Sequence, residues 1–321
     1  MPVGNSDRGV GLWAGQVMFG LDNSAQYIDW WHDELPGSSE NFEHEGTLTS
    51  LIFTPTLTIG LSNYWNMTIG QTIGNRSMIW GGDSTTIHHR DEGTDSDFSN
   101  AEGGWLGDTK IMFRYLIFND GQGPGKRWFL GGGLVMPSKN TLTSDPFFLN
   151  DTENKTDHRH FSLSEGIYKG VLEMQFFKKK MTNPVFMGGT LAATLPLNEN
   201  KYGFKSSRIY DLSLTAFSKK IAKINASLGG SMIARHTTTA FWNGAGAPNS
   251  QATVVTVGGG LLWNLAIGGV SLNAQKPFFV SGAFSGIEGE VGQRVSAWQL
   301  SISYRKMLNY VIPWLNPLDD L

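Results

Sequence analysis

The chain has 321 residues, of which 40% are hydrophobic and only 17% are charged, whereas typical soluble domains have roughly 45–50% and about 25%. Its 11 tryptophans and 19 phenylalanines exclude a disordered chain, and the net charge of −3 gives no sign of a nucleic-acid binder. The lack of cysteine excludes a disulfide scaffold, a thiolate metal site and a cysteine nucleophile.

Alternation with a period of two residues is the main pattern along the chain. In 51–61 the odd positions carry Leu, Phe, Pro and Ile, while the even positions are mostly threonine. The runs 110–117 and 298–305 alternate in the same way, with lysine, arginine, serine or glutamine on the polar face. Such runs indicate strands with one apolar face and one small or polar face.

About a dozen runs of this kind follow one another. The predicted strands are 11–22, 47–61, 66–78, 107–118, 128–138, 161–177, 184–198, 207–217, 224–238, 251–263, 267–283 and 294–306.

The segments between these strands alternate in length. The short ones are 62–65, 119–127, 178–183, 218–223 and 264–266, and the long or polar ones are 23–46, 79–106, 139–160, 199–206, 239–250 and 284–293. Short turns at one end and long loops at the other are typical of an outer-membrane barrel. We therefore predict an all-β fold, a single antiparallel transmembrane β-barrel of about 12 strands in 1–306, with short periplasmic turns, long extracellular loops and a periplasmic tail in 307–321. A soluble β-sandwich is the alternative.

The segment 104–138, GWLGDTKIMFRYLIFNDGQGPGKRWFLGGGLVMPS, combines a Gly-x-x-Gly-Asp strand start, an aromatic-rich strand and a glycine-rich strand ending in Met-Pro. It resembles the outer-membrane family named for the meta-pathway of phenol degradation. The hairpins at 57–74 and 258–277 and the closing strand at 298–305 look like those of the same family, in the same order. The resemblance implies a bacterial outer-membrane β-barrel that passes small, often hydrophobic or aromatic, molecules. It supplies no functional residues.

Seven charged residues fall on the face predicted to point inward. They are Lys110, Arg114, Lys169, Glu173, Asp211, Arg235 and Arg305, with a net charge of +3. Charges on alternating strand positions must face water or one another rather than lipid. They predict either a polar channel lining or a set of salt bridges that fills the barrel.

The predicted long loops are acidic, with nineteen acidic and six basic residues. These acids would attract cations to the mouth, or bridge lipopolysaccharide phosphates through divalent ions, or simply stay hydrated. Six of the seven histidines lie in the first three long loops. His88, His89, His158 and His160 lie beside aspartate and glutamate, so they are candidate ligands for a transition metal. Isolated surface histidines are the alternative.

Motifs for catalysis are absent from the sequence. Ser231 and His236 are one candidate pair on a strand, but their parity predicts opposite faces. The sequence thus favours a non-enzymatic outer-membrane channel without cofactor or nucleic-acid partner. It would lie in the lipid bilayer beside lipopolysaccharide and pass a small molecule by diffusion, gated by loops 23–46 and 79–106. The alternatives are a surface protein that captures metal cations with its loops, and a structural barrel that sheathes a partner protein.

Overall fold

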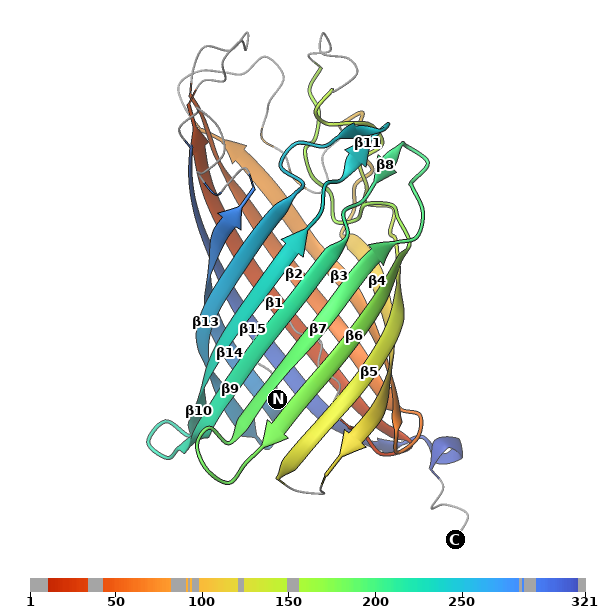
Figure 1. The fold of residues 1–321 in the computed structure, drawn as a ribbon, viewed down its shortest axis with the longest axis vertical. Helices are drawn as coiled ribbons and strands as arrows, with labels where there is room; N and C mark the ends of the chain where they lie inside the picture. Colours follow the sequence, from red (N-terminus) through yellow and green to blue (C-terminus); the bar gives the residue numbers. More distant parts are fainter. Residues whose placement is uncertain are drawn as a thin grey trace.

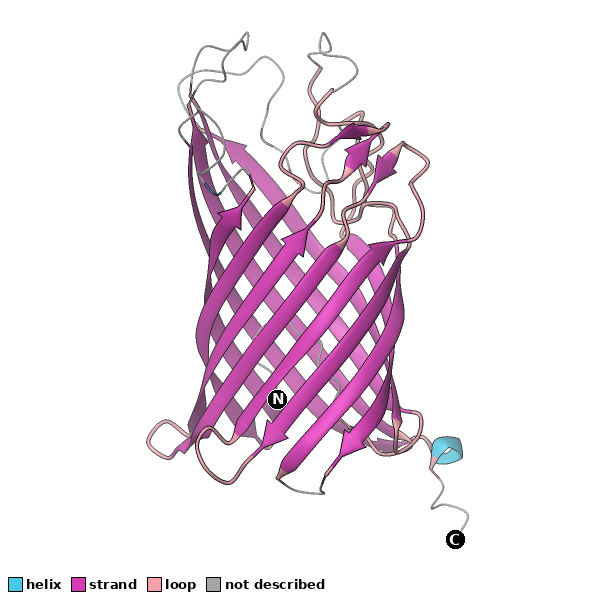
Figure 2. Cartoon of the chain, in the orientation of Figure 1, coloured by secondary structure: helices cyan, strands magenta, loops and turns pink. Residues whose placement is uncertain are grey.

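A computed structural model describes residues 11–33, 43–81, 91, 93, 98–120, 124–148, 156–282, 285 and 293–316. Twelve strands form a closed barrel in the order β1-β15-β14-β13-β10-β9-β7-β6-β5-β4-β3-β2. Each strand is antiparallel to both of its neighbours, and the strands run obliquely around the barrel (Figures 1 and 2). The predicted fold class is therefore confirmed.

The alternating runs of the sequence correspond to the barrel strands. These are β1 (Gln16–His32), β2 (His44–Gly60), β3 (Trp65–Trp80), β4 (Leu106–Asn119), β5 (Gly125–Met136), β6 (Lys169–Lys179), β7 (Phe186–Pro196), β9 (Ile209–Ile221), β10 (Ala226–Thr237), β13 (Ala252–Leu265), β14 (Gly268–Ser281) and β15 (Gln293–Val311).

The long and short connections lie at opposite ends of the barrel, as the sequence predicts. The described parts of the long connections lie at the upper end in Figure 1, and the described tight turns lie at the lower end. Both ends of the described chain lie at the short-turn end, where the backbone N–H of Ile312 donates to the carbonyl of Gly15 at 2.9 Å. We call the two ends the long-loop end and the short-turn end.

Four segments differ from the sequence prediction. β1 extends to His32, so 23–32 is strand rather than loop, and it pairs with both β2 and β15. Residues 161–168 were expected to begin a strand, but β6 starts only at Lys169. β15 continues to Val311, beyond the expected end at Lys306, and a 3-10 turn, η2 (Pro313–Leu315), follows it. A small sheet of β8 (Phe204–Lys205), β11 (Phe241–Trp242) and β12 (Ala245–Gly246) lies among the long connections.

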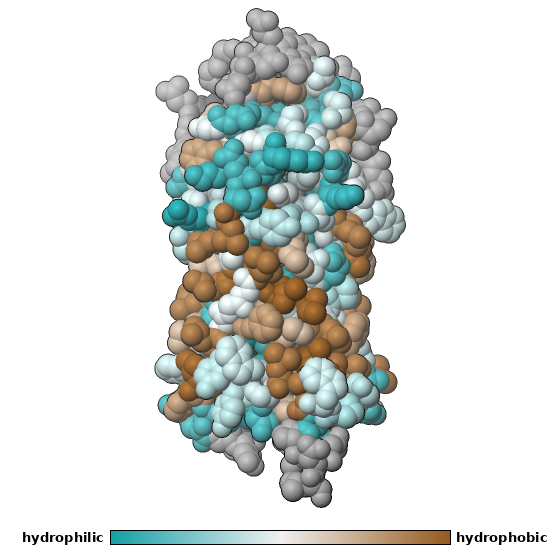
Figure 3. All heavy atoms as spheres, turned by 90° about the vertical axis from the view of Figure 1, so that its right-hand side faces the viewer, coloured by the Kyte–Doolittle hydropathy of each residue, from teal (hydrophilic) through white to brown (hydrophobic). Residues whose placement is uncertain are grey.

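The outer face of the barrel is apolar around its middle. Leu57, Phe113 and Leu172 are among the outward-facing side chains that the fold leaves exposed. Brown apolar atoms cover the central part of the barrel in Figure 3, and hydrophilic atoms gather above them towards the long loops. An exposed apolar belt of this extent is unfavourable in water and favourable in a bilayer. The described residues include no helix that is long and apolar enough to cross a membrane.

Candidate channel lumen and outer mouth

All seven charged residues predicted to face inward lie on inward-pointing strand positions, and six of them form ion pairs. Arg114 pairs with Glu173 and Arg235 with Asp211, so two of the pairs lie within the predicted set. The other two pairs use carboxylates that the sequence did not single out: Lys169 binds Glu165 and Arg305 binds Asp22. Asp22 and Glu165 therefore offset two of the three positive charges expected on the inner face.

The Arg114–Glu173 pair is the most deeply buried of the four. The Arg114 side chain has no exposed surface, and its Nε donates to Glu173 Oε1 at 2.6 Å. Its Nη1 donates to Thr68 Oγ1 at 3.0 Å, and Gln175 Nε2 donates to Glu173 Oε1 at 2.8 Å. Each charged group has hydrogen-bonding partners, which is the condition for burying an ion pair without a large penalty. This network narrows the lumen along β3, β4 and β6.

Arg235 and Asp211 meet a different environment. The Arg235 side chain is 54% exposed, although it points to the inside of the barrel and bonds Asp211 at 2.7 Å. An inward-facing charge with this exposure indicates open space in the lumen beside β9 and β10. The inner face is therefore filled beside β4 and β6 and open beside β10.

Apolar side chains pack together inside the barrel towards the short-turn end, and Phe129 and Phe217 among them are buried. Phe129, Phe177, Phe186 and Phe217 form a series of ring contacts with centroids 5.7–6.2 Å apart. Leu262 packs against the same group. Aromatic rings of β5, β6, β7 and β9 therefore occupy this side of the barrel interior near the short-turn end.

The connection between β5 and β6 folds over the long-loop end of the lumen. Asn140 is 2% exposed, and its side chain accepts from the backbone N–H of Leu163 at 2.8 Å and donates to the carbonyl of Gly104. Asn100 bonds both the N–H and the carbonyl of Arg159. Two asparagines therefore fasten the β5–β6 connection to the β3–β4 connection. The described residue Ile167, in the segment expected to be strand, is fully buried in this fold.

A cavity of about 340 Å³ lies under these connections, and we call it the vestibule. Its lining combines apolar rings with polar groups. Among the residues that line it are Arg76, Phe147, His160, Phe161, Glu165 and Trp242. Arg76 Nη1 donates to the carbonyl of Ser162 at 2.7 Å, so the floor of the vestibule is polar where it meets the barrel.

Aromatic and imidazole rings form a continuous series beside the vestibule, and we call this series the mouth cluster. It runs from His44 through His32, Trp30 and Trp80 to His160, with neighbouring ring centroids 5.0–5.9 Å apart. At His160 it divides: one branch is Phe147, at 6.2 Å, and the other is His158, at 4.6 Å, followed by Phe148 at 4.5 Å from His158. The first four come from β1, β2 and β3, and the others come from the β5–β6 connection. The Trp and His side chains of β1, β2 and β3 occupy alternate, inward-facing positions, and the pairing of these strands brings their rings together. Because the sequence pattern assigned 23–46 to a loop, it could not predict this arrangement.

The predicted metal site is not assembled among the described residues. His158 and His160 lie together, with ring centroids 4.6 Å apart, but His158 Nδ1 is bonded to the carbonyl of Thr156. Within the part of the chain that the structure describes, no three His, Cys, Asp or Glu side chains are grouped closely enough to hold a metal ion. His88 and His89 lie outside the described residues.

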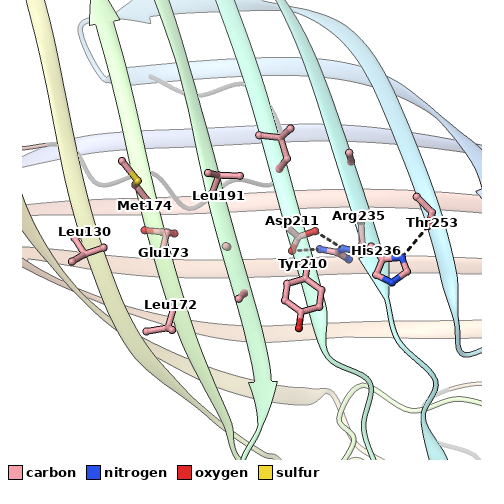
Figure 4. Close-up of a pocket in the computed structure, with 14 residues that line it drawn as sticks. Leu130, Leu172, Glu173, Met174, Leu191, Tyr210, Asp211, Arg235, His236 and Thr253 are labelled. Carbon is pink, nitrogen blue, oxygen red and sulfur yellow. Dashed lines mark hydrogen bonds and ion pairs between the residues drawn. The ribbon is translucent and has the colours of Figure 1, made fainter.

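A pocket of about 490 Å³ on the outer face includes His236. Leu172, Leu191 and Tyr210 flank it, and the His236 ring is stacked at 6.5 Å on Tyr210 and bonded through Nδ1 to Thr253 Oγ1 at 2.9 Å (Figure 4). Ser231 lies opposite Thr215 on the inward face. Ser231 and His236 therefore point to opposite sides of the barrel wall, as expected from their odd and even positions in the strand. The pocket beside His236 presents an apolar surface to lipid.

The chain matches no protein-family model and no curated protein. Among solved structures, the COG4313 outer membrane channel from Pseudomonas putida F1 has a TM-score of 0.62 at 12% identity, covering 96% of this chain and 100% of that one. A TodX monoaromatic hydrocarbon channel mutant has a TM-score of 0.42 at 12% identity, covering 93% and 91%. A Pseudomonas aeruginosa FadL homologue has 0.41 at 8%, covering 90% of each chain. The closed barrel, its apolar belt and the first of these likenesses show the fold of a bacterial outer-membrane β-barrel channel.

Proposed function

We propose that the chain is a passive channel through which small hydrophobic or aromatic molecules cross the bacterial outer membrane. The observation that carries this proposal is the mouth cluster, a series of rings that leads from the long-loop end to the vestibule. Aromatic rings bind other aromatic rings through offset or edge contacts, each worth about 0.5–1.5 kcal/mol. Contacts of this strength bind an aromatic molecule weakly, so that it dissociates readily and can pass on.

The lumen below the vestibule supports passage rather than storage. Its charges are mostly neutralised in pairs, so a neutral molecule would meet no strong field of one sign. The Arg235 side chain is 54% exposed inside the barrel, which indicates open space in its long-loop half. The resemblance to the phenol-degradation family, noted in the sequence, points to the same class of molecule.

The proposal is tested by current recordings of the purified full chain in a planar bilayer, with phenol added on the long-loop side. We expect brief interruptions of the current whose frequency rises with phenol concentration. Trp80→Ala, which removes the central ring of the mouth cluster, should reduce this frequency. Trp128→Ala is the matched control, because Trp128 is an exposed tryptophan of the outer face. Equal effects of phenol on all three proteins would contradict the proposal.

The two alternatives from the sequence predict other outcomes. Capture of metal cations by the loops predicts binding of Zn²⁺ that is lost when His158 and His160 are replaced, and no dependence on Trp80. A sheath for another protein predicts a barrel without conductance. The same preparation therefore separates the three functions.

A further inference from the structure

A second cavity, of about 200 Å³, lies on the inner wall formed by β1, β2, β3 and β4. Alternate residues of these strands line it: hydroxyl groups come from Ser24, Thr54, Thr56 and Thr72, an apolar surface comes from Ile52, and an ammonium group comes from Lys110. We call it the Lys110 cavity. It combines hydrogen-bond donors and some apolar wall with a positive charge at Lys110, and the carboxylate of Asp22 also lines it.

The strand register explains why space is left at this point. Lys110 lies opposite Gly70, Gly70 opposite Thr56, Thr56 opposite Gly20, and Gly20 opposite Arg305. Thr56 is thus flanked by two glycines on the inner face. The Arg305 side chain fills the space above Gly20, where an added Cβ would lie 2.7 Å from Nη1. Above Gly70 an added Cβ would come closest to the methyl group of Thr56, at 3.2 Å, and its next neighbours would be the Pro55 carbonyl oxygen and the Thr54 methyl group, both at 3.8 Å, so more space is left there than above Gly20.

Lys110 differs from the other cations of the predicted inward-facing set. Arg114, Lys169, Arg235 and Arg305 each have a carboxylate partner. Among the residues that the structure describes, no carboxylate lies within ion-pair distance of Lys110. Asp22 also lines the cavity, but it binds Arg305 and lies three strands away from Lys110, which is about 14 Å along the wall at a strand spacing of about 4.8 Å. The Lys110 end of the cavity is therefore positive.

We propose that the Lys110 cavity binds a small organic acid with one ring, and that Lys110 pairs with its carboxylate. This inference rests on the proposed function, because the ligand reaches the cavity only through the lumen. The size fits: a cavity of about 150 Å³ holds one benzene molecule. An inorganic anion would leave most of the 200 Å³ to water. The threonine hydroxyls donate to the carboxylate oxygens, and Ile52 and the threonine methyl groups contact the ring.

The test is equilibrium dialysis of radiolabelled benzoate against the full chain in detergent micelles. Lys110→Met should weaken binding roughly tenfold or more, because it removes a hydrogen bond to a charged group. Lys110→Arg should keep most of the affinity. Lys223→Met, which removes the same charge from an exposed turn, should have no effect. Benzyl alcohol, a neutral molecule of similar size, should compete weakly and equally in all variants.

Benzoate binding by Lys110→Met at wild-type strength would overturn the proposal, and so would failure of the wild type to bind benzoate. The shift in gel mobility on heating checks that each variant is folded, and Lys110→Arg provides the comparison if Lys110→Met fails to fold. Dialysis does not depend on conductance. A barrel that conducts but shows no Lys110-dependent binding refutes this site alone. A barrel that binds benzoate through Lys110 but never conducts refutes the proposed function and leaves the site standing.

Discussion

Arg114 on β4 and Glu173 on β6 form a two-point ion pair across a glycine on the intervening strand. Arg114 Nε lies 2.6 Å from Glu173 Oε1 and Nη2 lies 3.3 Å from Oε2. Gly131 lies opposite both residues in the register, and a Cβ there would lie 3.2 Å from Arg114 Cγ and 3.3 Å from Glu173 Oε1. The glycine lets two side chains that are two strands apart meet at hydrogen-bond distance.

Glu173→Gln should lower the free energy of unfolding by about 3–5 kcal/mol, because the buried Arg114 loses its counter-charge. The double variant Arg114→Met/Glu173→Met should recover most of that loss. Asp211→Asn is the control: its partner Arg235 is 54% exposed, so the loss should stay below about 1 kcal/mol. Urea titrations in lipid vesicles measure all of these values. Equal losses for Glu173→Gln and Asp211→Asn would show that Arg114 is hydrated.

Neighbouring glycines of β5 should respond differently to alanine. A Cβ on Gly133 would overlap the carbonyl oxygen of Ile111 and the sulfur of Met112, whereas on Gly132 the nearest atom is a carbonyl oxygen at 3.9 Å. We expect Gly133→Ala to destabilise the barrel by about 1–3 kcal/mol through overpacking. Gly132→Ala should change the free energy of unfolding little. The same urea titrations test this, and a larger loss at Gly132 would mean that the register of β5 is wrong.

A charged side chain on the outward face should destabilise the barrel. Leu57 is 38% exposed on the outer face of β2, so Leu57→Arg should reduce the free energy of unfolding by about 2–4 kcal/mol if it lies near the middle of the bilayer. Leu57→Met is the control for the change in shape. Thr58, the next residue, faces inward and bonds Thr68 at 3.0 Å. A cost for Leu57→Arg no greater than that of Leu57→Met would place Leu57 in water.

The barrel itself could be predicted from the sequence because lipid and lumen impose opposite demands on alternate residues. The pattern in 51–61 is strong enough to set both the strand and the direction of its faces. It fails for 23–32, because Asn23, Ala25 and Asp29 lie at outward positions and give no apolar contrast. The partner of Lys169 was missed for a related reason: Glu165 lies outside any strand and reaches the lumen through a folded connection. The alternation of residues along a strand gives no information about side chains in such connections.

The fold over the vestibule should depend on Asn140. Asn140→Ala removes the bonds to Leu163 and Gly104 and leaves buried backbone groups without partners, at about 1–3 kcal/mol. We expect faster amide hydrogen exchange in 159–166 without loss of the barrel. Asn198→Ala is the control, since Asn198 bonds the N–H of Tyr168 at the exposed rim. Unchanged exchange in Asn140→Ala would show that other contacts hold the connection.

Single-channel recording of the purified barrel in a planar bilayer, with reversal potentials at two salt concentrations, tests most directly that the chain is a channel. We expect stepwise currents that are nearly unselective at physiological salt, because all but one of the predicted inner charges are paired and the acidic loops are screened beyond about 8 Å. At lower salt the currents should shift towards cations. The absence of steps in a folded barrel would contradict the account. Strong cation selectivity that persists at high salt would also contradict it, and would mean that the acidic loops, rather than the paired lumen, form the narrowest part of the path.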